Sequence, residues 1–281
     1  MPRTAAEKRA AFRALHESGC FMLPNPWDAG SARYLETLGF KALATTSSGF
    51  AWSKGHADNH VTRDAVLAHL REIVEATDLP VNADFESGFG ATPDDVAHSV
   101  KLAVQTGVAG LSIEDSTGDA SSPLFPVAVA VARMKAARRA IDETGGDTLL
   151  VGRAENFFAG KPDIDDAIAR LKAYSDAGAD CLYAPGIKTR EQIEAVVKAA
   201  APNPVNFLNS GAFGFTVSDL AAMGVRRISV GGSLARVAMH AFIRVATEIA
   251  RDGKFDGFAG LISNPELNRL FDAERSRMAK P

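Results

Sequence analysis

Two carboxylates separated by one residue follow an apolar run in the first half of the chain. Asp84 and Glu86 lie in the segment 80–90 (PVNADFESGFG), which then breaks on two glycines. Side chains alternate along a strand, so residues i and i+2 project to the same side. Two neighbouring negative charges disfavour each other unless a cation lies between them. The spacing therefore predicts a site for a divalent metal ion.

Two later apolar runs also end in charged residues. Glu114 directly follows the run Leu-Ser-Ile, and Arg153 directly follows the run Leu-Leu-Val-Gly. A barrel of parallel strands brings its strand ends together at one rim, where its chemistry is concentrated. We therefore expect these two residues to meet Asp84 and Glu86 in space.

An oxygen-only metal site is the chemistry that these residues favour. Mg²⁺ takes about six oxygen ligands and touches proteins through one or two carboxylates. Of the 6 histidines, only His56 and His60 fall in a loop after a predicted strand. A histidine-rich zinc centre is therefore disfavoured, and Mg²⁺, or Mn²⁺ in its place, is expected. The alternative is that the acidic residues cap helices or form ion pairs with Arg153.

Strand-like and helix-like segments alternate along the whole chain. The predicted strands are residues 20–23, 42–46, 80–84, 109–113, 149–153, 180–183, 204–208 and 226–230. The predicted helices are residues 29–38, 63–76, 93–106, 127–144, 164–177, 191–200, 217–223 and 234–251. Eight such pairs predict an α/β TIM-type (β/α)8 barrel with a parallel sheet.

Helical segments flank this barrel at both ends of the sequence. Residues 4–19 have a helical pattern, and a further helical segment covers about residues 253–281. We expect one barrel domain over residues 1–281, with this C-terminal extension packed on its own barrel or on another subunit.

The composition excludes several classes of partner. The 281 residues are 46% hydrophobic and 23% charged, with a net charge of −3, which gives no reason to expect nucleic acid. No apolar run approaches the ~20 residues of a membrane span, and no signal peptide is evident. Cys20 and Cys181 are expected to be free thiols. A cytoplasmic protein that binds small molecules is the expectation.

The segment Thr46-Ser47-Ser48-Gly49-Phe50 follows the second predicted strand. A Ser-Gly turn at this place can direct backbone N–H groups into the cavity, where they would stabilise an oxyanion or enolate. Arg153 can hold a carboxylate through its planar fork of donors, although a structural ion pair is an equal alternative.

Together these motifs resemble the signatures of the phosphoenolpyruvate mutase and isocitrate lyase superfamily. The matching segments are residues 48–50, 82–90, 112–115 and 152–155, in the same order and spacing, and the likeness extends from residue 23 to residue 234. The resemblance implies a modified α/β barrel that binds Mg²⁺ and a 2-oxo acid. It also implies a homodimer or homotetramer in which the terminal helix is exchanged between subunits.

The resemblance also implies roles for individual residues. Asp84 resembles the principal metal carboxylate, Glu86 and Glu114 resemble residues that hold the metal's water ligands, and Asp58 resembles a further acidic residue of this shell. The expected substrate-binding residues are Ser48, Gly49, Phe50, Asp84, Arg153 and Asn206. Of the rim residues, Arg153, Ser48, Gly49 and Glu114 are expected to take part in catalysis.

The loop at residues 116–125 (STGDASSPLF) departs from the family pattern. It lacks the cysteine that serves as an acid in the isocitrate and methylisocitrate lyases, and it lacks the lysine and asparagine of the phosphonopyruvate-handling members. Asp119, Ser121 or Ser122 could transfer a proton, and a flexible linker is the alternative.

The resemblance implies a Mg²⁺-dependent lyase that cleaves a C–C bond of a small 2-oxo or 2-hydroxy (di)carboxylic acid through a metal-bound pyruvate-type enolate. One alternative is a mutase or hydrolase of the P–C bond of phosphonopyruvate, and another is a non-catalytic protein that binds 2-oxo acids. A third is a phosphate-binding barrel that uses residues 209–212 and 231–233. Schiff-base chemistry is disfavoured because no lysine lies in a predicted strand.

Overall fold

Eight parallel strands form a nearly closed barrel. The computed structural model describes the backbone of residues 2–278 and the side chains of residues 2–272. The strands are β1 (Phe21–Leu23), β2 (Leu43–Ala44), β3 (Val81–Asp84), β4 (Gly110–Glu114), β5 (Leu149–Arg153), β6 (Cys181–Tyr183), β7 (Val205–Leu208) and β8 (Arg227–Ser229). They pair in the order β1-β8-β7-β6-β5-β4-β3-β2. Between β2 and β1, the Ala44 N–H donates to the Pro24 carbonyl over 3.1 Å. The predicted TIM-type barrel is confirmed.

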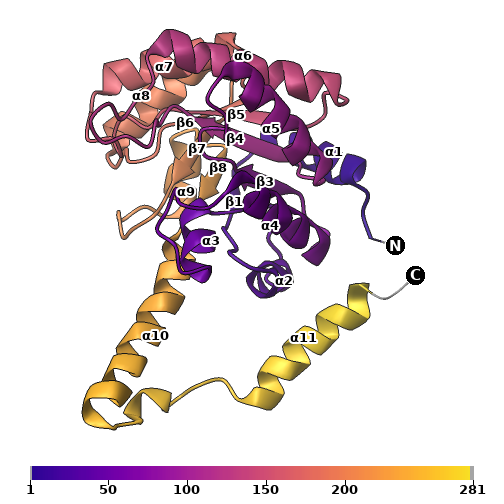
Figure 1. Cartoon of the computed structure of the whole chain (residues 1–281), viewed down its shortest axis with the longest axis vertical. Helices are drawn as coiled ribbons and strands as arrows, with labels where there is room; N and C mark the ends of the chain where they lie inside the picture. Colours follow the sequence, from indigo (N-terminus) through magenta and orange to yellow (C-terminus); the bar gives the residue numbers. More distant parts are fainter. Residues whose placement is uncertain (1, 279–281) are drawn as a thin grey trace.

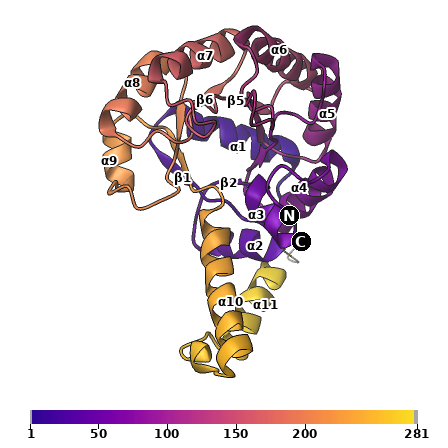
Figure 2. The ribbon, with the colours of Figure 1, turned by 60° about the vertical axis from the view of Figure 1, so that its left-hand side comes forward.

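Helices surround the strands, as Figure 2 shows. They are α1 (Ala5–Glu17), α2 (Ala29–Thr37), α3 (Ser47–Ser53), α4 (Arg63–Ala76), α5 (Pro93–Gln105), α6 (Val127–Glu143), α7 (Ile164–Asp176), α8 (Arg190–Ala200), α9 (Val217–Ala222), α10 (Ser233–Asp252), the 3₁₀ turn η1 (Asp256–Phe258) and α11 (Asn264–Met278). Helix α1 lies across the barrel, and its Phe12 packs with Phe21 of β1. The N-terminal helix therefore contributes to the barrel core.

Capping side chains fix where several helices begin. The Thr92 hydroxyl accepts the Asp95 N–H and the Thr216 hydroxyl accepts the Asp219 N–H, and each aspartate carboxylate in turn accepts the backbone N–H of its threonine. Such capping boxes satisfy N–H groups that have no partner within the helix. The helix starts predicted at residues 93 and 217 are confirmed.

The register of the sheet brings the charged strand ends together. Asp84 pairs with Ser112, Glu114 pairs with Arg153, and Arg153 pairs with Tyr183 on the next strand. Each of these residues lies at or near the carboxyl end of its strand. The charges that lie far apart in the sequence therefore share one rim of the barrel.

Local structure after two strands differs from the sequence-based expectation. Residues 42–46 were predicted as a strand followed by a turn, but only Leu43–Ala44 is a strand and Ser47–Ser53 forms helix α3. Thr46 caps this helix by accepting the Gly49 N–H. The β3 strand ends at Asp84, and Glu86 has a positive φ of 47°. The predicted strand alternation of Asp84 and Glu86 is therefore wrong.

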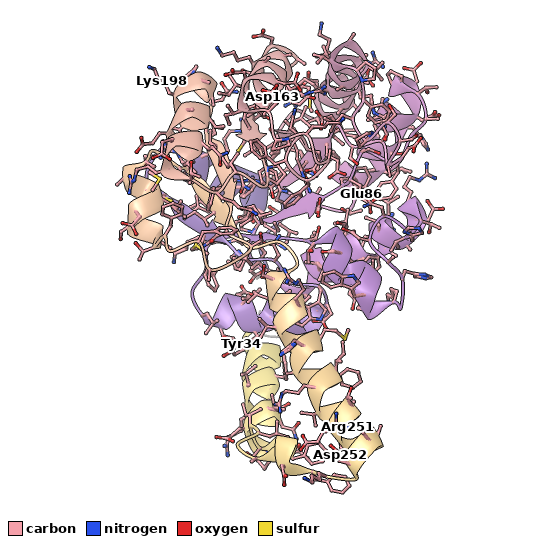
Figure 3. The ribbon with its side chains drawn as sticks, turned by 90° about the vertical axis from the view of Figure 1, so that its left-hand side faces the viewer. Tyr34, Glu86, Asp163, Lys198, Arg251 and Asp252 are labelled. Carbon is pink, nitrogen blue, oxygen red and sulfur yellow. The ribbon has the colours of Figure 1, made fainter. Side chains whose placement is uncertain are left out.

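The last two helices form an arm that leaves the barrel. Helix α10 extends away from the strands, and the chain then returns through α11 to contact α2 (Figure 1). Arg251 and Asp252 lie at the far end of α10 (Figure 3). The division between a barrel domain and an extension from about residue 253 stays a prediction, and residues 279–281 lie outside the described residues.

Apolar side chains of the arm are exposed. Phe242 of α10 is 67% exposed and Leu261, between η1 and α11, is 66% exposed, while Ala235 is the buried residue of α10. None of the helices in the described part of the chain, α10 and α11 included, has the length and apolarity that crossing a bilayer requires. Cys20 and Cys181 are free thiols, as predicted.

Candidate functional site

A cavity of about 420 Å³ opens at the carboxyl ends of the strands. Most of the predicted site residues contribute to its wall. They include Ser48, Asp58, Asp84, Glu114, Arg153 and Asn206, to which the structure adds Asn82, Ser112, Glu155, Tyr183, Arg227 and Ser229. The barrel thus assembles one site from β3 to β8 together with the segment around α3.

Arg153 is the centre of the charged groups at the rim. Its Nη1 lies 3.0 Å from Asp84 Oδ1 and 3.2 Å from Glu114 Oε2, and its Nε forms a close ion pair with Glu155. Burial acts to lower the pKa of Arg153, but the charges of Glu114, Glu155 and Asp84 raise it above its usual value. The ion pairing that the sequence left open as an alternative is therefore present.

Two further carboxylates make the rim strongly acidic. Burial, followed by the charges of Asp84 and Asp58, raises the pKa of Glu86 to about 8. Burial and the charge of Asp84 also raise the pKa of Asp58. Glu86 is placed after β3 (Figure 3) and is not among the residues that line the cavity, although it interacts electrostatically with Asp58, Asp84 and Arg153, which do line it. Five carboxylates thus surround one guanidinium.

The donor set suits a hard cation held partly through water. Asp84 Oδ2 accepts the Ser47 N–H over 3.0 Å, while its Oδ1 pairs with Arg153. Among the side chains of residues 2–272, no three metal-binding groups converge tightly enough to ligate one ion together. Mg²⁺ commonly binds through one or two carboxylates and keeps several waters, which this spacing permits. Asp84, Glu86, Glu114 and Asp58 stay the predicted residues for the metal and its waters.

Helix α3 presents its first turn to the cavity. The Ser48 N–H has no hydrogen-bond partner among the described residues, whereas the Gly49 N–H donates to Thr46 Oγ1 over 3.3 Å. A Cβ at Gly49 would lie 2.7 Å from Thr46 Cγ2 and 3.1 Å from Ala235 Cβ. A glycine is therefore required for α3 to pack this close to α10. Ser48 is the better placed of the two predicted oxyanion donors.

Phe50 does not present its side chain to the cavity. Its ring is buried and stacks on His69 of α4, with 3.9 Å between the ring centroids. This geometry therefore gives no side-chain contact that would support the prediction that Phe50 binds substrate. The 3.6-residue period of the helix places Ser48 and Phe50, two positions apart, on different sides of α3.

Several wall residues received no role from the sequence. Asn82 and Ser112 precede Asp84 and Glu114 by two positions, so they project to the same side of the sheet one layer lower. Glu155 belongs to the Gly-Arg-Ala-Glu motif, yet no role was assigned to it. A polar residue two positions before a strand-end carboxylate was the signal that could have identified the first two.

The loop over residues 116–124 covers one side of the cavity. A β-bridge joins Ser116 to Leu124, and Asp119 lines the cavity wall. Asp119 accepts hydrogen bonds from the side chain and backbone of Ser121, which lower its pKa. Asp119 is therefore an ionised carboxylate and a poor source of a proton.

The substitution Glu86→Gln tests the electrostatic origin of this site. Between pH 4.5 and about 8 the folded protein holds a proton on Glu86 that the unfolded chain releases, so stability falls as pH rises through this window. We expect the free energy of unfolding of the wild type to fall by about 3 kcal/mol across this window, allowing for solvent screening, and we expect this fall to be absent in Glu86→Gln. Urea unfolding without divalent ions, at about pH 5 and about pH 8.5, measures this change in the free energy of unfolding.

The exposed carboxyl of Glu75 on α4 provides the matched control for this measurement. Glu75→Gln should leave the pH dependence of the wild type unchanged, because this side chain is exposed and has no hydrogen bond or ion pair with the residues that the structure describes. An identical loss of stability with pH in Glu86→Gln and in the wild type would contradict the assignment.

Comparisons with known proteins agree with this geometry. The profile of the family described as phosphoenolpyruvate phosphomutase matches residues 12–250. A crystal structure from Burkholderia cenocepacia J2315, assigned only provisionally as a lyase/mutase, is 48% identical with a TM-score of 0.90, covering 95% of this chain and 96% of that one. Phosphonopyruvate hydrolase in complex with oxalate and Mg²⁺ is 28% identical with a TM-score of 0.83, covering 96% and 97%.

A relative with a named activity is similar over most of the sequence. The oxaloacetate decarboxylase of Bradyrhizobium sp. (strain BTAi1 / ATCC BAA-1182) is 32% identical over 238 residues, which is 82% of this chain and 77% of that protein. The matched segments include the strands that end in Asp84, Glu114 and Arg153. The chain therefore belongs to the phosphoenolpyruvate mutase and isocitrate lyase superfamily.

Proposed function

We propose that this chain is a Mg²⁺-dependent lyase that cleaves a C–C bond of a small 2-oxo or 2-hydroxy dicarboxylic acid. The observation that carries the proposal is the meeting of Arg153 with an excess of carboxylates in one cavity at the strand ends. The guanidinium can anchor a substrate carboxylate, and the remaining acidic oxygens can hold a hard cation beside it. The similarity to an oxaloacetate decarboxylase supports C–C chemistry.

Arg153 is suited to bind the carboxylate next to the keto group. Its Nε and Nη1 are engaged by Glu155, Asp84 and Glu114, while its Nη2 forms no hydrogen bond among the described residues. The remaining N–H groups can therefore receive an incoming anion. The ring of Tyr183, 5.2 Å from the guanidinium carbon, limits the orientations that Arg153 can adopt.

Cleavage of a 2-oxo acid requires a place for an electron pair. When the C3–C4 bond of a substrate such as oxaloacetate breaks, CO₂ leaves and the pair moves to the C2 oxygen, after which C3 takes up a proton. The unpartnered Ser48 N–H can donate to that oxygen as its charge grows. When bound, Mg²⁺ would supply Lewis-acid stabilisation of the same charge.

The covering loop is consistent with a reaction that needs no acid from the lid. Its Asp119 is held ionised by Ser121, and no cysteine occurs in the loop. Gly118 and Ala120 also line the cavity, so the loop can shield the site from water without supplying a proton. Loss of CO₂ or of a carboxylate fragment suits such a loop better than a cleavage that depends on a cysteine.

Product analysis tests the proposed reaction directly. With Mg²⁺, we expect pyruvate to form from oxaloacetate or from an alkylmalate, and the rate to fall at least about 100-fold on chelation or in Asp84→Ala. Asp94→Asn, which alters an exposed carboxylate at the start of α5, should retain the wild-type rate. Unchanged pyruvate formation after chelation and in Asp84→Ala would refute the metal-dependent mechanism.

The same panel distinguishes the alternatives. Turnover of phosphonopyruvate with release of phosphate would favour P–C chemistry, for which the similarity to phosphonopyruvate hydrolase is the supporting observation. Mg²⁺-dependent binding of pyruvate without turnover of any substrate in the panel would instead indicate a binding protein.

We also propose that a second copy of this chain covers the exposed arm, giving a homodimer or homotetramer. Contiguous exposed apolar residues commonly mark protein interfaces, and closed symmetric assemblies are the commonest form. Sedimentation should give a mass of two or four times 29.7 kDa. Phe242→Lys on α10 should lower it, whereas Arg251→Gln at the far end of α10 should not. A wild-type monomer would contradict this proposal.

A further inference from the structure

Arg227 of β8 is a buried cation that the proposed reaction does not yet use. Arg227 is 2% exposed, and it lines the same cavity as Arg153. Among the side chains that the structure describes, no carboxylate comes within 4.0 Å of its guanidinium. Burial lowers the pKa of Arg227, but an arginine stays charged in proteins. The floor of the cavity therefore holds a positive charge without a counter-charge from this chain.

Neutral acceptors hold the guanidinium in place. Its Nε donates to Asn206 Oδ1 over 2.9 Å, and its Nη1 donates to Asn82 Oδ1 over 3.3 Å. Nη1 also lies 3.4 Å from Nε2 of His16 on α1. Burial and the charge of Arg227 lower the pKa of His16 to about 3, so this ring is a neutral acceptor. These contacts satisfy donors but leave the charge uncompensated.

The contacts also determine what the two asparagines present to the cavity. Because Arg227 takes both amide oxygens, their NH₂ groups must point elsewhere, and Asn206 Nδ2 donates to Ser229 Oγ over 3.0 Å. Nδ2 of Asn82 donates to the Ala83 carbonyl. One hydrogen of the Asn206 amide remains for a ligand. The floor is therefore rich in donors and poor in acceptors.

Space for this layer is provided by a glycine. A Cβ at Gly110 of β4 would lie 2.8 Å from Asn82 Oδ1 and 2.8 Å from Phe12 Cε1. The absent side chain lets Asn82 point inward and reach Arg227. The layer lies below the acidic rim, since Asn82 precedes Asp84 by two residues on β3.

We propose that Arg227 is a specificity-determining residue that binds the second carboxylate of a dicarboxylic substrate at the floor of the cavity, with Asn206 as its neutral partner. The inference rests on the proposed function, in which Arg153 and the acidic rim hold the first carboxylate and its neighbouring oxygen. A substrate with a second anionic group would then supply the counter-charge that Arg227 lacks. A monocarboxylic acid of the same size would leave the cation unpaired.

The alternative is that Arg227 only fastens α1 to the barrel. Its guanidinium carbon lies 5.9 Å from the centroid of the Phe12 ring, and the contact to His16 joins the same helix. A purely structural residue would affect all ligands equally. The ratio of affinities for two ligands that differ only in the second carboxylate therefore separates the two roles.

Calorimetry with Mg²⁺-loaded protein measures this ratio. Malate and 2-hydroxybutyrate are the matched probes, and pyruvate and oxalate test the rim alone. We expect the wild type to bind malate at least about tenfold more tightly than 2-hydroxybutyrate, as expected for one charge-assisted anchor. Arg227→Met should lose most of this preference while binding pyruvate within about twofold of the wild type. Arg226→Met, whose native side chain contacts the Gly19 carbonyl, should keep the preference.

A second variant keeps the test decisive if Arg227→Met folds poorly. Asn206→Asp is nearly isosteric and gives Arg227 a counter-charge from the protein itself. We expect a higher Tm and a loss of the malate preference, because the internal carboxylate competes with that of the ligand.

The outcomes distinguish this inference from the proposed function. Suppose that pyruvate and oxalate bind the wild type. The role of Arg227 alone would then be overturned if the wild type showed no preference for malate over 2-hydroxybutyrate, or if both variants kept that preference unchanged. Failure of pyruvate and oxalate to bind the Mg²⁺-loaded wild type would overturn the proposed function and this inference with it.

Discussion

Excess negative charge around a single guanidinium is the constraint on which this site depends. Asp84, Glu114 and Glu155 pair with Arg153, while burial and the charge of Asp84 raise the pKa values of Asp58 and Glu86 despite the opposing charge of Arg153. Such an arrangement opposes folding, because buried like charges repel and lose their hydration. It persists because the ladders between β3, β4 and β5 fix the backbone positions that carry these groups. The scaffold supplies the stability that the site itself lacks.

The cavity is organised in two layers of opposite character. The upper layer contains the acidic residues at the strand ends, and the lower layer contains amides, hydroxyls and Arg227. The two-residue period of a strand produces this division, since Asn82 lies below Asp84 on β3 and Ser112 lies below Glu114 on β4. A cation is therefore favoured at the rim, and an anionic group is favoured between Arg153 and the floor. Few neutral ligands would benefit from both layers.

The covering loop and helix α3 give the site its chemical character within the family. Ser121 keeps Asp119 ionised, so proton transfer from the loop is disfavoured. Helix α3 begins at the cavity wall and leaves the Ser48 N–H available, while Gly49 allows the close approach of α10. The catalytic potential therefore resides in the rigid barrel wall more than in the loop. These parts support the proposed reaction, which forms an enolate and needs no acid from the loop.

The sequence by itself determined the barrel and most of the rim. Apolar runs separated by amphipathic segments specify eight strand and helix pairs, and capping threonines fix several helix starts, because both signals act over a few residues. Strand-end charges such as Asp84, Glu114 and Arg153 could be identified for the same reason. The residue types and their local order were sufficient for these features.

Only the tertiary structure decided how these residues interact. Arg153 pairs with Asp84 across 69 residues of sequence, and Arg227 reaches Asn82 across 145, distances over which local pattern carries no information. The positive φ at Glu86, the helix at Ser47–Ser53 and the stacking of Phe50 on His69 likewise arise from packing. Barrel closure determines which side chains share the interior, and the resulting burial sets their charges and partners.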